Sequence, residues 1–144
     1  MTRGRLLRLV DTDLVRRSIG EAEKGTSGQI RVSVSTLFWG DPRRAAERAF
    51  DRLGMRGTAE RNGVLLFIVP ARKRFVVLGD EGIHARVGQE FWNDVAGAMS
   101  ERFRKGDFTG GIVHGVETVG RELAAHFPHR AGQGNELPDD VDLG

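Results

Sequence analysis

The chain has 144 residues, the length of one domain, and its 39% hydrophobic residues are enough to form a single core. The 22 basic residues nearly balance the 20 acidic ones, so the formal net charge of +2 gives no sign of nucleic-acid binding. The absence of cysteine excludes disulfides, thiolate metal sites and cysteine nucleophiles. The sequence contains no secretory signal and no apolar run of about 20 residues, which predicts a cytoplasmic protein without a membrane span.

The first part of the chain predicts a basic arm followed by a helix. We expect residues 1–10 to form a flexible arm, because they are short and carry three arginines, Arg3, Arg5 and Arg8. A single domain then extends over residues 11–128. Asp11 or Thr12 can cap its first helix, in which apolar residues recur at helical spacing as far as Ala22.

The middle of the chain alternates strands with a helix. The segment "IRVSV" (30–34) alternates apolar and polar residues, which predicts a half-buried strand with one polar face. Asp41 and Pro42 then begin a helix that ends at Gly54. The run "GVLLFIV" (63–69) is apolar at nearly every position and therefore suits a central strand, followed by a hairpin loop (70–73) and a third strand (74–79).

Two long helices complete the domain, one after Ile83 and one from about Ile112 to Phe127. Residues 129–144 form a tail without periodicity, which is either mobile or packed as an extended segment. A strand–helix–strand unit favours two parallel strands, and the hairpin adds an antiparallel neighbour. The sequence therefore predicts an α/β fold: a three-layer α/β/α sandwich with a small mixed sheet.

This topology brings three polar loops to one edge of the sheet. The hairpin returns "GDEG" (79–82) to the edge at which the first two strands begin, close to "GTSG" (25–28) and "TAERNG" (58–63). These loops carry oxygen donors of the kind that Ca²⁺ and Mg²⁺ prefer: Thr26, Ser27, Glu60, Asn62, Asp80 and Glu81. Simpler readings remain open, because Asp80 or Glu81 can favour the start of the next helix, and Asn62-Gly63 is a common turn.

The order of several segments resembles the TPM domain family, the thylakoid acid phosphatase-like domain, in its short soluble bacterial form. The resemblance extends from about residue 11 to residue 140 and rests on motifs that include "AEKGTSGQIRVSV", "ERNGVLLFIVPARKRFVVLGDEGI", "FRKGDFTGGIVHGV" and "NELPDD". It implies a Rossmann-like fold, divalent-cation binding at loops near the sheet edge, and acid phosphatase activity.

The residues themselves give the phosphatase reading little support. There is no cysteine, no P-loop pattern, and no Asp-x-Asp motif after a strand. His84 is the best histidine for an acid or a ligand, although a residue in the first turn of a helix is the simpler reading. Asp107, in the family-like "GDF" segment, is either a ligand or the cap of the last helix.

Three hypotheses follow from these observations. The first is a non-catalytic accessory or interaction domain that binds Ca²⁺ or Mg²⁺ through Thr26, Glu60, Asn62, Asp80, Glu81 and Asp107. The second is a weak metal-assisted acid phosphatase that uses the same loop, and the third is a purely structural protein-interaction domain. We expect a monomer with a protein partner, for which the loop residue Trp39 is a candidate anchor.

Overall fold

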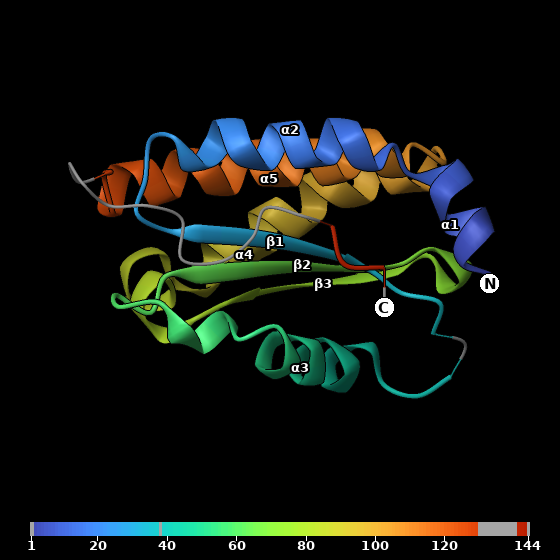
Figure 1. Cartoon of the computed structure of the whole chain (residues 1–144), viewed down its shortest axis with the longest axis horizontal. Helices are drawn as coiled ribbons and strands as arrows, with labels where there is room; N and C mark the ends of the chain where they lie inside the picture. Colours follow the sequence, from blue (N-terminus) through green and yellow to red (C-terminus); the bar gives the residue numbers. More distant parts are fainter. Residues whose placement is uncertain (1, 38, 130–140, 144) are drawn as a thin grey trace.

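The computed structural model describes residues 2–37, 39–129 and 141–143. In this part of the chain a three-stranded sheet lies between helices on both of its faces (Figure 1). Strand β1 (Gln29–Val34) is parallel to β2 (Gly63–Val69), which is antiparallel to β3 (Arg74–Gly79). The order β1-β2-β3 places the apolar β2 in the centre, so the predicted α/β fold with a small mixed sheet is confirmed.

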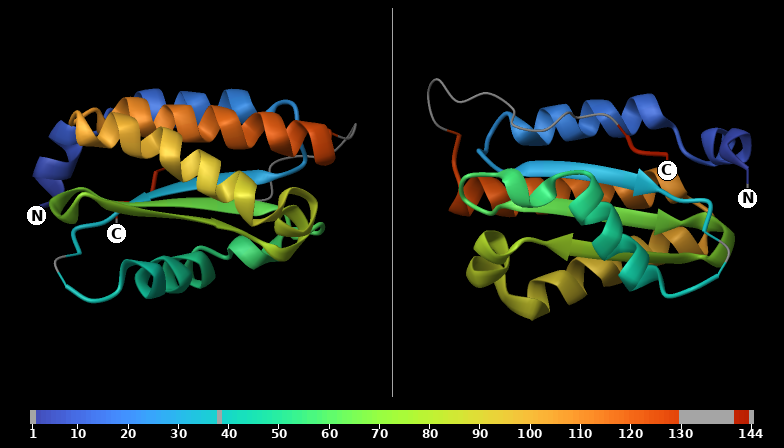
Figure 2. Two further views of the ribbon diagram at one scale, coloured as in Figure 1. Left: turned by 180° about the vertical axis from the view of Figure 1, so that it is seen from behind. Right: turned by 60° about the horizontal axis from the view of Figure 1, so that its bottom comes forward.

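The alternation of side chains along β2 divides the interior into two cores. Val64, Leu66 and Ile68 face the larger core, which is covered by α2 (Thr12–Glu23), α4 (Glu81–Arg104) and α5 (Phe108–His126). Leu65, Phe67 and Val69 face the opposite core, which is covered by α3 (Pro42–Arg52). Figure 2 shows α3 alone on its side of the sheet, opposite α2, α4 and α5. Both faces of the central strand are therefore dry, which explains its unbroken apolar sequence.

Aspartates begin the helices, as their positions in the sequence predict. The Asp11 side chain accepts a hydrogen bond from the Leu14 amide, and the Asp41 side chain accepts one from Arg43, with Pro42 in the first turn. Asp107 caps α5 by accepting from the Gly110 amide at 2.8 Å. Each cap satisfies an amide that the helix itself leaves without a partner.

Two features interrupt the regular elements. Gly88 has φ 74° and ψ 173°, so the long helix α4 is kinked there. A left-handed residue of this kind is tolerated because glycine has no Cβ. A short 3₁₀ turn, η1 (Met55–Gly57), precedes β2. A second one, η2 (Pro70–Arg72), connects β2 to β3, and Lys73 with φ 52° completes this hairpin turn.

The structure differs from the prediction of a flexible arm at residues 1–10. Arg3–Leu9 form a helix, α1, whose first amides are capped by Thr2. Leu6 is fully buried and Val10 is 2% exposed, and both belong to the larger core. Leu6 lies between the arginines in the sequence, and its packing in the core holds this segment in place. The domain core thus begins before residue 11.

The polar face of β1 is also covered, contrary to the prediction of a half-buried strand. Arg31, Ser33 and Ser35 are all buried. The Ser33 hydroxyl donates to the Asp142 carboxylate at 2.8 Å, and Asp142 forms a parallel bridge with Ser33. The prediction for the tail falls mostly on residues 130–140 and 144, which lie outside the described residues.

Candidate functional site

The three polar loops meet at one edge of the sheet, as the topology predicts. The Gln29 amide donates to the Asn62 carbonyl, the Asp80 amide donates to Gly63, and the Gly82 amide donates to Arg61. The loop approach at Gly82 is so close that a Cβ there would overlap the carbonyl oxygens of Glu60 and Arg61. The loop that contains Gly40 lies at the opposite edge, where the Gly40 carbonyl accepts a hydrogen bond from Arg72 at 2.7 Å. That loop is therefore not part of this cluster.

Arg61 occupies the position that a cation would take between the two adjacent acids. Its guanidinium donates to both oxygens of Asp80, at 2.7 and 3.0 Å, and to Glu81 Oε1 at 3.3 Å. The Asp80 side chain is 1% exposed and also caps α4 through the Glu81 amide at 2.8 Å. The hydrogen bonding that Arg61 donates to Asp80 raises the pKa of Arg61 above its ordinary value, so the guanidinium stays charged.

Asp80 and Glu81 therefore do not fit the predicted ligand set in this arrangement. A bidentate arginine uses both carboxylate oxygens of Asp80 and neutralises the charge that would attract a cation. Arg56 adds a second positive charge, with its Nη1 3.9 Å from Asp80 Oδ1. An arginine partner was an alternative to a metal ion, but the sequence pattern did not indicate which arginine would reach the two acids. The basic residue stood in the same "TAERNG" segment.

The other predicted donors form a separate, neighbouring group. Glu60 Oε2 accepts from the Ser27 hydroxyl at 3.0 Å and from Asn62 Nδ2 at 3.5 Å, and Asn62 Nδ2 donates to Ser27 Oγ at 3.2 Å. Asn62 is 1% exposed, and its buried Oδ1 has no hydrogen-bond partner among the residues that the structure describes. Ser27 was in the same loop as the predicted ligand Thr26, and its hydroxyl, rather than that of Thr26, reaches Glu60.

Thr26 and Asp107 have structural roles at opposite ends of α5. The Thr26 hydroxyl donates to the Phe127 carbonyl, just past the end of α5, and accepts from the Gly28 amide at 3.0 Å. Asp107 caps the beginning of the same helix. A helix of 19 residues is about 28 Å long, so Asp107 cannot join the loop cluster. Of the two alternatives that the sequence offered for Asp107, ligand or helix cap, the structure shows the cap.

A cavity of about 350 Å³ lies beside Glu60 and is lined by Glu60, Gly82, Arg86, His126, Phe127 and Pro128. Arg86 stacks over the ring of Phe127, with 5.9 Å from Cζ to the ring centroid. His126 Nε2 lies 3.2 Å from Glu122 Oε1, one turn earlier on α5. This cavity gives solvent a route to the Glu60 carboxylate, which is partly exposed.

The other histidine near the loops, His84, is exposed but hydrogen-bonded to a core side chain. His84 Nδ1 accepts a hydrogen bond from the indole of the buried Trp92 at 2.9 Å. In residues 2–37, 39–129 and 141–143, no group of three or more His, Asp or Glu side chains is placed to hold a metal ion. Trp39 is 80% exposed on its loop.

With this geometry in place, comparison with known proteins assigns the chain to a family. Residues 4–122 match the TPM domain, and the chain belongs to the TPM domain family. The BA42 protein from the psychrophilic bacterium Bizionia argentinensis is 35% identical, with 92% of each chain covered and a TM-score of 0.86. A comparison with curated proteins gave no match.

Two further solved structures share the fold at lower identity. The N-terminal domain of the cg2496 protein from Corynebacterium glutamicum is 14% identical, covers 92% of this chain and 77% of its own, and has a TM-score of 0.60. An N-terminal domain from P. gingivalis is 18% identical, covers 79% of this chain and 76% of its own, and has a TM-score of 0.63. Among the helices described, none combines the length and the apolar character that crossing a membrane requires.

Proposed function

We propose that this chain is a non-catalytic accessory domain that binds a divalent cation, Ca²⁺ or Mg²⁺, through Glu60, Asn62 and Ser27. The observation that supports this most directly is Asn62 Oδ1, a buried carbonyl oxygen without a hydrogen-bond partner beside a carboxylate. A buried acceptor left without a donor is costly, and a cation is one partner that would satisfy it. Hard oxygen ligands of this kind suit Ca²⁺ and Mg²⁺.

The proposed ligand set predicts weak binding. It contains one carboxylate, whereas tight calcium sites use several, so we expect affinity in the range of about 0.1 to 1 mM. A cation between Glu60 and Ser27 would tie the loop before β2 to the loop before β1, because these residues come from those two loops. Binding would therefore stiffen one edge of the sheet without changing the fold.

Thermal unfolding in increasing Ca²⁺ or Mg²⁺ tests the proposal. A ligand that binds only the folded state at ten times its Kd stabilises by about 1.4 kcal/mol. For a domain of this size that corresponds to a rise in Tm of roughly 3 to 6 °C. Glu60→Gln should abolish the rise, because it removes the charged ligand while keeping the shape of the side chain.

Glu81→Gln is the matched control, since the Glu81 side chain is 73% exposed and carries the same charge one loop away. It should leave the Ca²⁺-dependent rise intact. If Glu81→Gln abolishes the rise and Glu60→Gln does not, the site belongs to the Asp80–Glu81 pair. No rise at several millimolar of either cation would refute cation binding by this domain.

We do not carry the phosphatase alternative forward, because Asp80, the buried acid on which it depended, is already bound by Arg61. An accessory domain acts through a protein partner, and the exposed Trp39 gives such a partner an aromatic contact. We also propose that the protein is cytoplasmic and that the cation it binds is Ca²⁺ or Mg²⁺.

A further inference from the structure

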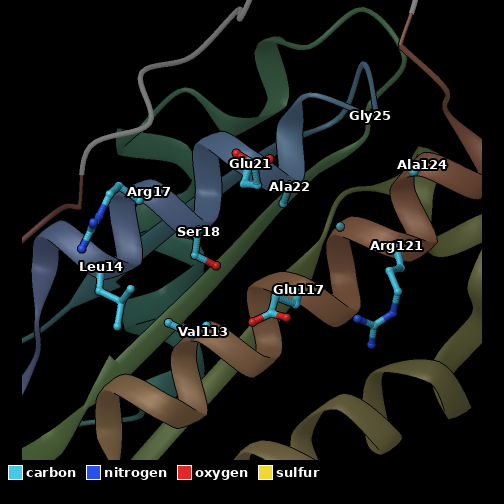
Figure 3. Close-up of a pocket in the computed structure, with 11 residues that line it drawn as sticks. Leu14, Arg17, Ser18, Glu21, Ala22, Gly25, Val113, Glu117, Arg121 and Ala124 are labelled. Atoms are coloured by element: carbon cyan, nitrogen blue, oxygen red, sulfur yellow. The ribbon is translucent and has the colours of Figure 1, made fainter.

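A long groove runs between α2 and α5, on the side of these helices that faces away from the sheet. Figure 3 shows it, with residues from both helices along its length. Its volume is about 640 Å³, and it is lined by Leu14, Arg17, Ser18, Glu21, Ala22, Gly25, Val113, Glu117, Gly120, Arg121 and Ala124. It is separate from the polar loops, since it shares no lining residue with the cavity beside Glu60.

The two helices run in the same direction, which places their residues in register. At the beginning, the Asp11 amide donates to Thr109 Oγ1 at 3.0 Å. At the other end, a Cβ at Gly25 would lie 3.6 Å from the Ala124 side chain. Residues of similar order along α2 and α5 therefore face each other across the groove.

The groove has one bulky end and one flat end. Leu14, which is 40% exposed, and Val113 lie at the bulky end. At the other end the small residues Ala22, Gly25, Gly120 and Ala124 form a flat floor, with the charged Glu21 and Arg121 beside it. The helices touch closely there, because a Cβ at Gly120 would come within 2.7 Å of the Ala22 side chain. A protruding leucine at one end and a flat surface at the other are complementary to each other.

The charges along the rim alternate in a diagonal pattern. On α2, Arg17 is followed one turn later by Glu21, and on α5, Glu117 is followed by Arg121. All four residues are exposed. In the described part of the chain no salt bridge joins α2 to α5 across this groove. Glu21 instead forms an ion pair within its own segment, with Lys24 Nζ at 2.9 Å from Glu21 Oε2.

We propose that the groove binds a second copy of this chain, turned end for end, in a two-fold symmetric dimer. A two-fold axis across the groove brings Leu14 of each copy over the flat end of the other. The same rotation sets Arg17 opposite Glu21 of the second copy, and Glu117 opposite Arg121. The surface thus complements itself in both shape and charge, although the sequence alone predicted a monomer.

Sedimentation velocity of the full chain from micromolar to submillimolar concentrations tests this proposal. We expect a concentration-dependent dimer, and a chain that stays monomeric throughout overturns the proposal and leaves the groove to another occupant. Leu14→Ser removes the protruding side chain and should weaken the dimer roughly tenfold. Because Leu14 is 40% exposed in the monomer, this change should lower thermal stability much less than truncation of a fully buried leucine such as Leu6.

Charge reversal tests the orientation of the two copies. Arg17→Glu should weaken the dimer roughly tenfold, because both Arg17–Glu21 contacts become repulsive. The double variant Arg17→Glu with Glu21→Arg should restore it, since each copy then presents the swapped pair to the other. If the axis ran along the groove instead, Arg17 would face Glu117, and the double variant would stay weak. That result overturns the end-for-end arrangement.

Arg43→Glu is the matched control. Arg43 and Glu47 lie four residues apart on α3, as Arg17 and Glu21 do on α2. This pair is on the opposite side of the sheet, with 3.6 Å between Arg43 Nε and Glu47 Oε1. The control makes the same change of charge and the same local repulsion, so the dimer should keep its affinity. An equal loss in Arg43→Glu and Arg17→Glu would mean that net charge, and not the groove, governs association, which refutes the proposal.

Discussion

Asp80 illustrates how one residue can be placed correctly by topology while its closest partner is not foreseen. The sequence marks it as an acid between glycines at the end of a strand, and the structure places it in the loop cluster that the topology predicts. The cation that it pairs with in the structure is the guanidinium of Arg61. The same chemistry attracts both, because a carboxylate that is nearly out of contact with water needs a positive charge and donors for its oxygens.

Asp80→Asn should therefore destabilise the fold whether or not Ca²⁺ is present. The amide keeps the shape but loses the charge and one acceptor, and we expect a loss of about 1 to 3 kcal/mol in the free energy of unfolding measured with urea. Glu81→Gln is the control, since that side chain is exposed and should change stability by less than about 0.5 kcal/mol. A variant Asp80→Asn as stable as the parent chain would show that the ion pair with Arg61 contributes nothing.

The residues that we propose bind a cation were only partly predictable for the same reason. Topology alone determined which loops meet, so Glu60 and Asn62 were found from strand order and loop position. Which oxygen remains without a partner depends on side-chain packing within 3 to 4 Å, as the contacts of Ser27 with Glu60 show. Local sequence does not contain that information, and Thr26 and Ser27 were indistinguishable until their hydroxyl contacts were known.

At the scale of the elements, strong local signals were sufficient. Asp41 with Pro42 predicted the start of α3, and the apolar run at 63–69 predicted the central strand. The signal failed for α1, where a helix of seven residues lies among arginines. So short a helix is not stable alone, and it forms because the core accepts Leu6. No pattern within ten residues reveals a contact made with the distant part of the chain.

Adjacent leucines in α1 test this account. Leu6 is fully buried, whereas Leu7 is 51% exposed on the same helix. Leu6→Ala should lower the free energy of unfolding by about 2 to 4 kcal/mol, because it removes a core side chain and leaves a cavity. Leu7→Ala should lower it by less than about 1 kcal/mol. Equal, small effects in urea unfolding would mean that the segment behaves as the flexible arm that its arginines suggest.

At the scale of the whole molecule, the end of the chain closes the sheet. β1 is an edge strand, and its exposed amides would be open to pairing with another chain. Asp142 covers part of this edge: its amide donates to the Val32 carbonyl at 2.9 Å, and its carbonyl accepts from the Val34 amide at 2.8 Å. Its carboxylate accepts from Arg52 on α3, at 2.8 and 3.3 Å, and this hydrogen bonding raises the pKa of Arg52. One residue thus joins the C-terminal segment to the edge strand and to the helix below it.

Asp142→Ala should loosen this closure without unfolding the domain. Arg52 is about half exposed, so water weakens the ion pair, and we expect a loss of about 1 to 2 kcal/mol that includes the hydrogen bond from Ser33. Hydrogen exchange at the Val34 amide should accelerate, because its acceptor would no longer be held in place. Asp51→Ala, which removes an ion pair with Arg56 between two exposed side chains, should cost less and leave Val34 protected. If Val34 stays equally protected in Asp142→Ala, the backbone bridge alone holds the end of the chain on β1.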